Sequence, residues 1–150
     1  MKLAGEYKVA NVLIDFGQDV GGCGRSITRD YWRVGLEDPA QPGKCWVGVV
    51  VTGQAVATSG DYIRHAMIEG KRYSHLIDPR NGYPVDNEVR AASIIAPTCT
   101  IAGLFSTATC ILGAREGARL VESHPSAAGA IITDTNKIFT LRFHEYVPKD

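Results

Sequence analysis

The sequence predicts an α+β domain in which two helices pack on one face of a mostly antiparallel sheet. Short apolar runs separated by turn residues occupy much of positions 9–96. The segment 98–123 then loses the alternation of strands, and strand-like runs return at 127–143. Many strands followed by two helices and two strands are typical of this fold class. A length of 150 residues suits one domain over 1–150 with one core.

Branched and aromatic residues bounded by turn residues predict the strands of the first part. Strands are expected at 9–16, 32–36, 45–51, 55–57, 73–77 and 89–96. We expect the glycine-rich segment 17–24 to be a turn, and 52–54 to join its two neighbouring strands as a hairpin. The segment 62–68 fits either a strand or a short turn of helix. Residues 79–82 combine proline and glycine in the order of a tight turn.

The last third of the chain predicts two helices and a closing hairpin. Residues 98–112 are rich in small side chains without β alternation, and Gly113 is a plausible C-cap. Residues 115–123 have the period of an amphipathic helix. We expect strands at 127–133 and 138–143, joined by a loop at 134–137.

Composition excludes several classes of protein. The 16 basic and 16 acidic residues balance, and no basic cluster indicates a nucleic-acid partner. No apolar run approaches the roughly 20 residues of a membrane span. The first residues lack the apolar core of a signal peptide, so the chain is either cytoplasmic or lacks a targeting segment. The 4 cysteines lack zinc-site spacing, and Cys99 and Cys110 are expected to be buried free thiols.

Three segments carry residues suited to chemistry. The first is 57–62, where Thr58, Ser59, Gly60 and Asp61 offer hydroxyls, backbone N–H groups and a carboxylate at the end of a strand. The second is 72–82, in which His75 could be a core histidine or a donor to a phosphate. The third is the helix segment 102–107, whose small face leaves room for a ligand or for close packing.

Other common sites are not indicated. The glycines of 17–24 match neither the dinucleotide fingerprint nor a P-loop. No local signature of a Ser/His/Asp or Cys/His catalytic set is present.

Taken in order, these segments resemble the ApbE family of FAD:protein FMN transferases. The resemblance runs from about Val9 to Thr133 and is most specific at 75–82. It implies that FAD is split with the help of a divalent metal, usually Mg²⁺, and that FMN is transferred to a Thr or Ser of a flavoprotein. It also makes a periplasmic location possible.

The resemblance assigns roles to individual residues. Residues 58–61, His75 and Asp78 would contact FAD, and Glu37 with Pro39 would lie near its adenosine end. His75 and Thr107 would act in catalysis, and Thr107 would also be a metal ligand.

Three departures from the family pattern are visible. The family helix has an Asp one turn before the Thr, and this chain has Gly103 there, which removes the anionic ligand. Family members are about twice as long, so the chain resembles their C-terminal half. The family usually has paired glycines where this chain reads Gly17-Gln18.

Two functions from different classes follow. The chain could be an FMN transferase subunit completed by a homo- or hetero-oligomeric partner that supplies the other half. It could instead be an inactive ApbE-like subunit that holds FAD or assists assembly. A truncated piece of a longer protein, or a relic of one, is the remaining possibility.

Overall fold

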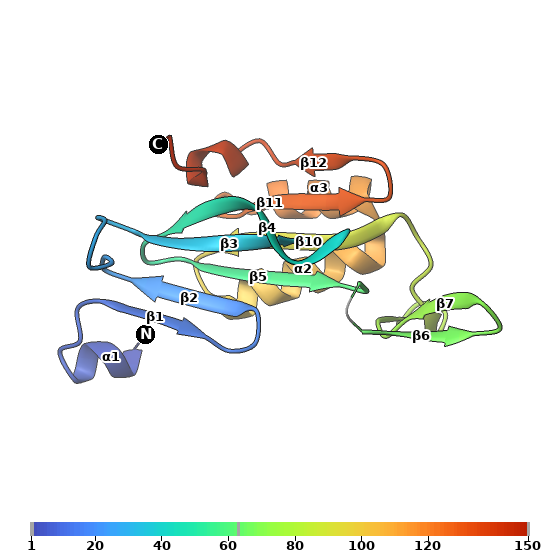
Figure 1. Cartoon of the computed structure of the whole chain (residues 1–150), viewed down its shortest axis with the longest axis horizontal. Helices are drawn as coiled ribbons and strands as arrows, with labels where there is room; N and C mark the ends of the chain where they lie inside the picture. Colours follow the sequence, from blue (N-terminus) through green and yellow to red (C-terminus); the bar gives the residue numbers. More distant parts are fainter. Residues whose placement is uncertain (1, 63, 150) are drawn as a thin grey trace.

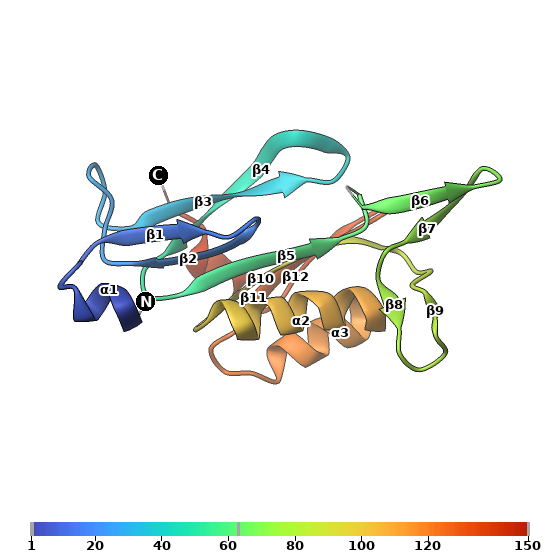
Figure 2. The same cartoon turned by 90° about the horizontal axis from the view of Figure 1, so that it is seen from below.

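A computed structural model describes residues 2–62 and 64–149, with Lys2 described by its backbone only. The chain folds in three layers, which Figures 1 and 2 show from two sides. Helices α2 (Cys99–Leu112) and α3 (Ala114–Glu122) cover one face of a central sheet. The hairpin of β3 (Trp32–Asp38) and β4 (Gln41–Val51) covers the other face.

The central sheet has six strands, and its neighbouring strands are antiparallel throughout. Its spatial order is β1 (Val12–Asp15), β2 (Asp19–Cys23), β5 (Ala55–Gly60), β10 (Val89–Ala96), β11 (Ala128–Thr133) and β12 (Lys137–Phe139). The predicted fold class is therefore confirmed.

Strand β10 is buried on both faces because each face meets a different layer. Ile94 packs with Val121 of α3, and the next residue, Ile95, packs with Leu36 and Val49 of the β3–β4 hairpin. Successive side chains of a strand point to opposite faces, so a continuous apolar run suits this central position. These two contacts hold the helices and the hairpin on one sheet.

Capping residues set the bounds of α2. The Thr98 hydroxyl accepts a hydrogen bond from the Ile101 backbone N–H at 3.2 Å, which satisfies one free donor of the first turn. Gly113 separates α2 from α3 with a φ of 87°, in the left-handed region that favours glycine. The C-cap at Gly113 is therefore confirmed.

Smaller elements extend from the layers. The hairpin of β6 (His65–Ile68) and β7 (Lys71–Ser74) projects beside β8 (Ile77–Asp78) and β9 (Tyr83–Pro84), as Figure 2 shows. Helix α1 (Lys2–Glu6) lies next to β1, and the 3₁₀ helix η1 (Phe143–Tyr146) follows β12. Within the described part of the chain, no helix has the length and apolarity of a membrane span.

Several sequence-based expectations about strands were wrong. Segment 17–24 is mostly strand β2 rather than a turn; Leu13, Trp32 and Val51 surround Gly22 so closely that a Cβ there would lie 3.1–3.2 Å from them. Residues 52–54 do not close a hairpin, because β4 pairs with β3 while β5 pairs with β2 and β10.

Several predicted strands have different bounds; β3, β4 and β5 are longer than predicted, and three others differ more. Strand β1 covers only 12–15 of the predicted 9–16, and it is an edge strand with alternate residues exposed. The run 73–77 is interrupted at 75–76, between β7 and β8. Residues 138–143 give only the end of β12 before the chain turns into η1. Segment 62–68 forms strand β6 from His65 on, and Ile63 lies outside the described residues.

Candidate functional site

The three chemically interesting segments meet at one cleft at the C-terminal end of β5. This cleft, here called the Ser59 cleft, has a volume of about 350 Å³. Its lining residues come from the β1–β2 turn, β5 and the loop after it, the β7–β8 junction and α2: Gly17, Gln18, Thr58, Ser59, Gly60, Tyr62, Arg64, His75, Leu76 and Thr107. Five of the predicted site residues are therefore brought together, although they are far apart in sequence.

A chain of hydroxyl groups ties β5 to α2 on the floor of the cleft. Ser59 Oγ lies 2.7 Å from Ser106 Oγ and 3.0 Å from Thr107 Oγ1. Ser106 Oγ donates its proton to the Gly103 carbonyl oxygen at 3.0 Å. Ser106 must then accept from Ser59, and Ser59 must accept from Thr107. With its own proton used in this way, the Thr107 oxygen offers only lone pairs to the cleft.

The neighbouring residue Thr58 faces the other side of β5. Its hydroxyl lies 2.8 Å from the Ser93 hydroxyl, and the two residues are paired in the register of β5 and β10. Thr58 lines the Ser59 cleft and also a second cavity on the hairpin side. It therefore stands between two adjoining spaces.

The His75 ring is held by a backbone carbonyl group rather than by an acidic side chain. Its Nδ1 atom lies 2.8 Å from the Arg64 carbonyl oxygen. A carbonyl oxygen can only accept, so Nδ1 carries the proton and donates it. In the neutral ring, Nε2 then has a free lone pair. That atom can accept a proton from a hydroxyl bound in the cleft.

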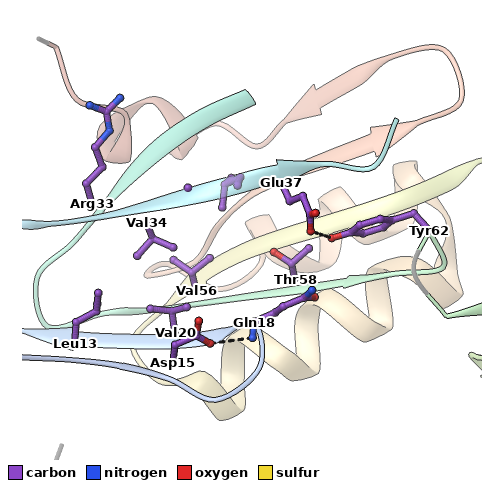
Figure 3. Close-up of a pocket in the computed structure, with 12 residues that line it drawn as sticks. Leu13, Asp15, Gln18, Val20, Arg33, Val34, Glu37, Val56, Thr58 and Tyr62 are labelled. Carbon is purple, nitrogen blue, oxygen red and sulfur yellow. Dashed lines mark hydrogen bonds between the residues drawn. The ribbon is translucent and has the colours of Figure 1, made fainter. Parts of the chain in front are cut away.

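The second space, here called the Glu37 cavity, has a volume of about 310 Å³ and lies between β3, β5 and the β1–β2 hairpin. Figure 3 shows its apolar wall, with Leu13, Val20, Val34 and Val56, and its polar end. Gln18, Thr58 and Tyr62 line both this cavity and the Ser59 cleft. Together the two spaces fall in the size range of about 300–1,000 Å³ that is usual for ligand sites.

Glu37 is fixed at the polar end of its cavity. One carboxylate oxygen accepts from the Tyr62 hydroxyl at 2.9 Å, drawn as a dashed line in Figure 3, and the other accepts from the Gly43 backbone N–H. Burial and the adjacent Glu37 carboxylate both raise the pKa of Tyr62, so its hydroxyl stays protonated as a donor.

Gly60 has a packing reason to be glycine. A Cβ at this position would lie 2.4 Å from the Arg90 carbonyl oxygen and 3.0 Å from the Tyr62 ring. The space that we expected a ligand to approach is thus filled by neighbouring protein atoms on that side. Gly60 nevertheless lines the Ser59 cleft through its backbone.

Three other predicted contacts with FAD lie outside both spaces. Asp61 is buried and forms ion pairs with Arg72 at 2.9 Å and Arg90 at 3.5 Å. Asp78 binds Arg80 through both carboxylate oxygens, and these bonds lower the pKa of Asp78. Pro39 lies in the β3–β4 turn and lines neither cavity. The two aspartates shape the loops around the cleft instead of facing it.

The residues around Thr107 do not fit a magnesium ion by themselves. Mg²⁺ prefers carboxylate and phosphate oxygens in an octahedral arrangement. Gly103 supplies no side-chain oxygen, and no aspartate or glutamate lines the Ser59 cleft. Over residues 2–62 and 64–149, no group of three or more His, Cys, Asp or Glu side chains is placed to hold a metal.

Sequence reasoning missed Gln18, Tyr62 and Arg64, which all line the Ser59 cleft. Gln18 was noted only as a departure from paired glycines. Its φ of 83°, next to Gly17 at 68°, is the signature of a type I′ turn between β1 and β2. That turn brings its side chain to the cleft, which local sequence could not show.

Comparison with known proteins gives a consistent result. A sequence model of the ApbE family matches residues 1–132. The FAD:protein FMN transferase of Haemophilus influenzae is 30% identical over 137 residues, which is 90% of this chain and 40% of that protein. The one from Treponema pallidum is 30% identical over 147 residues, 92% of this chain and 41% of that protein.

Solved structures agree with the sequence matches. The ApbE protein of Thermotoga maritima superposes with a TM-score of 0.87 at 27% identity, covering 99% of this chain and 48% of that one. The flavinyl transferase ApbE of Pseudomonas stutzeri, in its apo form, gives 0.81 at 27% identity, covering 97% and 46%. The chain thus spans less than half the length of these relatives, and it belongs to the ApbE family.

Proposed function

We propose that this chain is the flavin-dinucleotide-binding part of an FAD:protein FMN transferase, which attaches FMN from FAD to a Thr or Ser of a target flavoprotein. The observation that carries the proposal is the convergence of residues 58–60, His75 and Thr107 on one cleft. The adjoining Glu37 cavity extends the space, so that an elongated dinucleotide has room at both ends.

The proposed placement follows the chemistry of the two spaces. The adenosine end lies toward Glu37 and Pro39, and the diphosphate lies over residues 58–60. His75 and Thr107 are beside the phosphate that reacts. Asp61 and Asp78 contribute by holding Arg72, Arg90 and Arg80, which fixes the loops that carry His75.

The transfer step assigns a role to His75. The acceptor hydroxyl oxygen forms a bond to the FMN-side phosphorus, and the bond from that phosphorus to the bridging oxygen breaks. AMP leaves with the bridging oxygen and its electron pair. The proton of the acceptor hydroxyl passes to His75 Nε2, which is free because Nδ1 is bonded to the Arg64 carbonyl.

We also propose that a complementary ApbE-like polypeptide, of the same or another sequence, completes the site. The relatives' additional length supplies the reason, together with exposed apolar side chains near the edge strand β1. Leu3 in α1, Tyr7 after it and Phe16 in the β1–β2 turn are 65%, 76% and 78% exposed. Apolar surface beside an unpaired strand edge is typical of a surface that another chain covers.

An inactive subunit that holds FAD or assists assembly is the second candidate. Gly103 and the lack of a carboxylate in the Ser59 cleft favour it, because a carboxylate would be needed to hold a metal ion that neutralises charge on the departing AMP. The retained hydroxyls and His75 favour the transferase. An inactive subunit that holds FAD shares FAD binding with the transferase and differs from it in turnover, whereas an assembly subunit need not bind FAD.

The test measures binding and transfer separately. Calorimetry should show that the purified chain binds FAD, and in-gel flavin fluorescence should show negligible FMN transfer to an acceptor flavoprotein with FAD and Mg²⁺. Adding a complementary ApbE-like polypeptide should restore transfer. FAD binding without transfer in any combination would favour the inactive subunit, and robust transfer by the isolated chain would contradict the need for a partner.

Light scattering tests the partner surface. The chain should self-associate at high concentration or form a stoichiometric complex with the complementary polypeptide. Phe16→Ser should weaken either association, and Leu141→Ser, which alters a side chain 84% exposed beyond β12, is the matched control. A chain that stays monomeric and binds no complement would contradict the partner proposal.

A further inference from the structure

The Ser59 cleft has an unusual charge balance. Its ten lining residues include no acid and one permanently charged cation, Arg64. The two acids of the adjoining Glu37 cavity are occupied: Asp15 accepts from the Gln18 backbone N–H, and Glu37 accepts from Tyr62 and Gly43. The lining of the Ser59 cleft itself therefore carries a positive charge and no negative one, which suits an anion.

Arg64 is distinct among the arginines of the surrounding loops. Arg72, Arg80 and Arg90 are each paired with an aspartate. Within residues 2–62 and 64–149, no acid forms an ion pair with the Arg64 guanidinium, and its side chain is exposed. Its positive charge is therefore available to a ligand.

The backbone of Arg64 is fixed at the rim of the cleft. Its carbonyl oxygen accepts the hydrogen bond from His75 Nδ1 at 2.8 Å. The same bond therefore positions both Arg64 and His75, the proposed base. Arg64 lines the same space as Ser59, Gly60 and Thr107, and its side chain is exposed to solvent at the rim. A guanidinium in this position can donate two parallel hydrogen bonds to phosphate oxygens.

The residues around Thr107 offer no comparable charge. Thr107 contributes one neutral oxygen, and Gly103 contributes no side-chain atom. A diphosphate brought into a cleft still needs a positive partner, since an unpaired buried anion is strongly unfavourable. We propose that Arg64 is the cation that neutralises the diphosphate in this chain, so that FAD binds here without Mg²⁺. This inference rests on the proposed function.

The experiment measures FAD affinity by calorimetry at constant ionic strength, with EDTA or with MgCl₂. For the unmodified chain the two dissociation constants should agree within about twofold. Arg64→Gln should weaken FAD binding by roughly 10- to 100-fold in both buffers, as expected for loss of a charge-assisted hydrogen bond. Arg64→Lys should recover part of the affinity, because it restores the charge without the planar geometry.

Two controls distinguish loss of the Arg64 charge from a general disturbance of the fold. Riboflavin has no phosphate, so Arg64→Gln should leave riboflavin affinity unchanged. Arg115→Gln removes another exposed arginine, which lies on α3 outside the cleft, and it should not alter FAD affinity.

The outcomes distinguish this inference from the proposed function. Strong FAD binding that requires Mg²⁺ and ignores Arg64→Gln would overturn the role of Arg64 and leave the flavin site standing. An equal loss of riboflavin and FAD affinity in Arg64→Gln would also overturn it. A chain that binds no FAD in either buffer would overturn both.

Discussion

His75 donates its Nδ1 proton to the Arg64 carbonyl oxygen across 2.8 Å, and this bond joins the β7–β8 junction to the loop after β5. One hydrogen bond therefore fixes the tautomer of the proposed base and the backbone of the proposed phosphate-binding residue.

His75→Asn should reduce FMN transfer by about 10²–10⁴-fold while FAD affinity changes little. The asparagine amide can still donate to the Arg64 carbonyl, but no basic nitrogen remains at the Nε2 position. Transfer is measured by in-gel flavin fluorescence with the complementary polypeptide present, and binding by calorimetry. His144→Asn, in η1, is the matched control. Retention of full transfer by His75→Asn would refute the base assignment.

Gly103→Asp should make FAD affinity depend on Mg²⁺. Apart from the two chain neighbours and the nearby helix backbone, no heavy atom lies within 4 Å of a Cβ built at this position, so the new side chain starts in open space. It would restore a carboxylate one helical turn from Thr107. Calorimetry with and without Mg²⁺ checks this, and Gly103→Asn has nearly the same shape without the charge. Identical metal responses in the two variants would count against a site at this turn.

Gln18→Gly should raise the free energy of unfolding by about 0.5–1 kcal/mol, as measured by urea denaturation. The residue has a φ of 83°, and a non-glycine residue costs about 1–2 kcal/mol in this region. The greater freedom of glycine in the unfolded chain offsets part of that gain. Gln54→Gly, in the connection between β4 and β5, is the control. It should leave the free energy of unfolding unchanged or lower it. A stability loss in Gln18→Gly would show that the Gln18 side chain contributes more than its backbone strain costs.

The thiols should differ widely in reactivity. Burial raises the pKa of Cys110 to about 12, whereas Cys45 is exposed. Only the thiolate reacts, so at pH 8 roughly one Cys110 in ten thousand is in reactive form. Alkylation followed by mass spectrometry should label Cys45 first and Cys110 only after denaturation. Rapid labelling of Cys110 in the folded chain would contradict its burial.

Sequence reasoning succeeded where the determinants are local. The apolar run 89–96 and the small-residue segment 98–112 match β10 and α2 closely. A strand buried on both faces needs a continuous apolar run, and a helix end needs capping residues, so both can be recognised in the local sequence. It failed where strands pair over long distances. The glycines at 21–22 suggest a turn until Trp32 and Val51 are seen to fill the space beside them.

The site shows the same division. His75 and Thr107 could be identified from motifs, and they do meet in one cleft. Arg64 could not be found that way, because its proposed role depends on its forming no ion pair within the described residues, whereas Arg72, Arg80 and Arg90 each form one. Asp61 and Asp78 resembled ligand contacts because a carboxylate beside a turn looks the same whether it binds a ligand or an arginine.

In the hydroxyl chain, each group donates its proton to the next, from Thr107 through Ser59 and Ser106 to the Gly103 carbonyl. Loss of the Ser106 hydroxyl alone would change this order. In Ser106→Ala the Ser59 proton loses its acceptor and turns toward Thr107. The Thr107 proton then turns either to the Gly103 carbonyl one helical turn back, which has lost its Ser106 donor, or into the cleft. A substitution beneath the surface would thereby reset the hydrogen bonds of the hydroxyl that α2 presents to the Ser59 cleft.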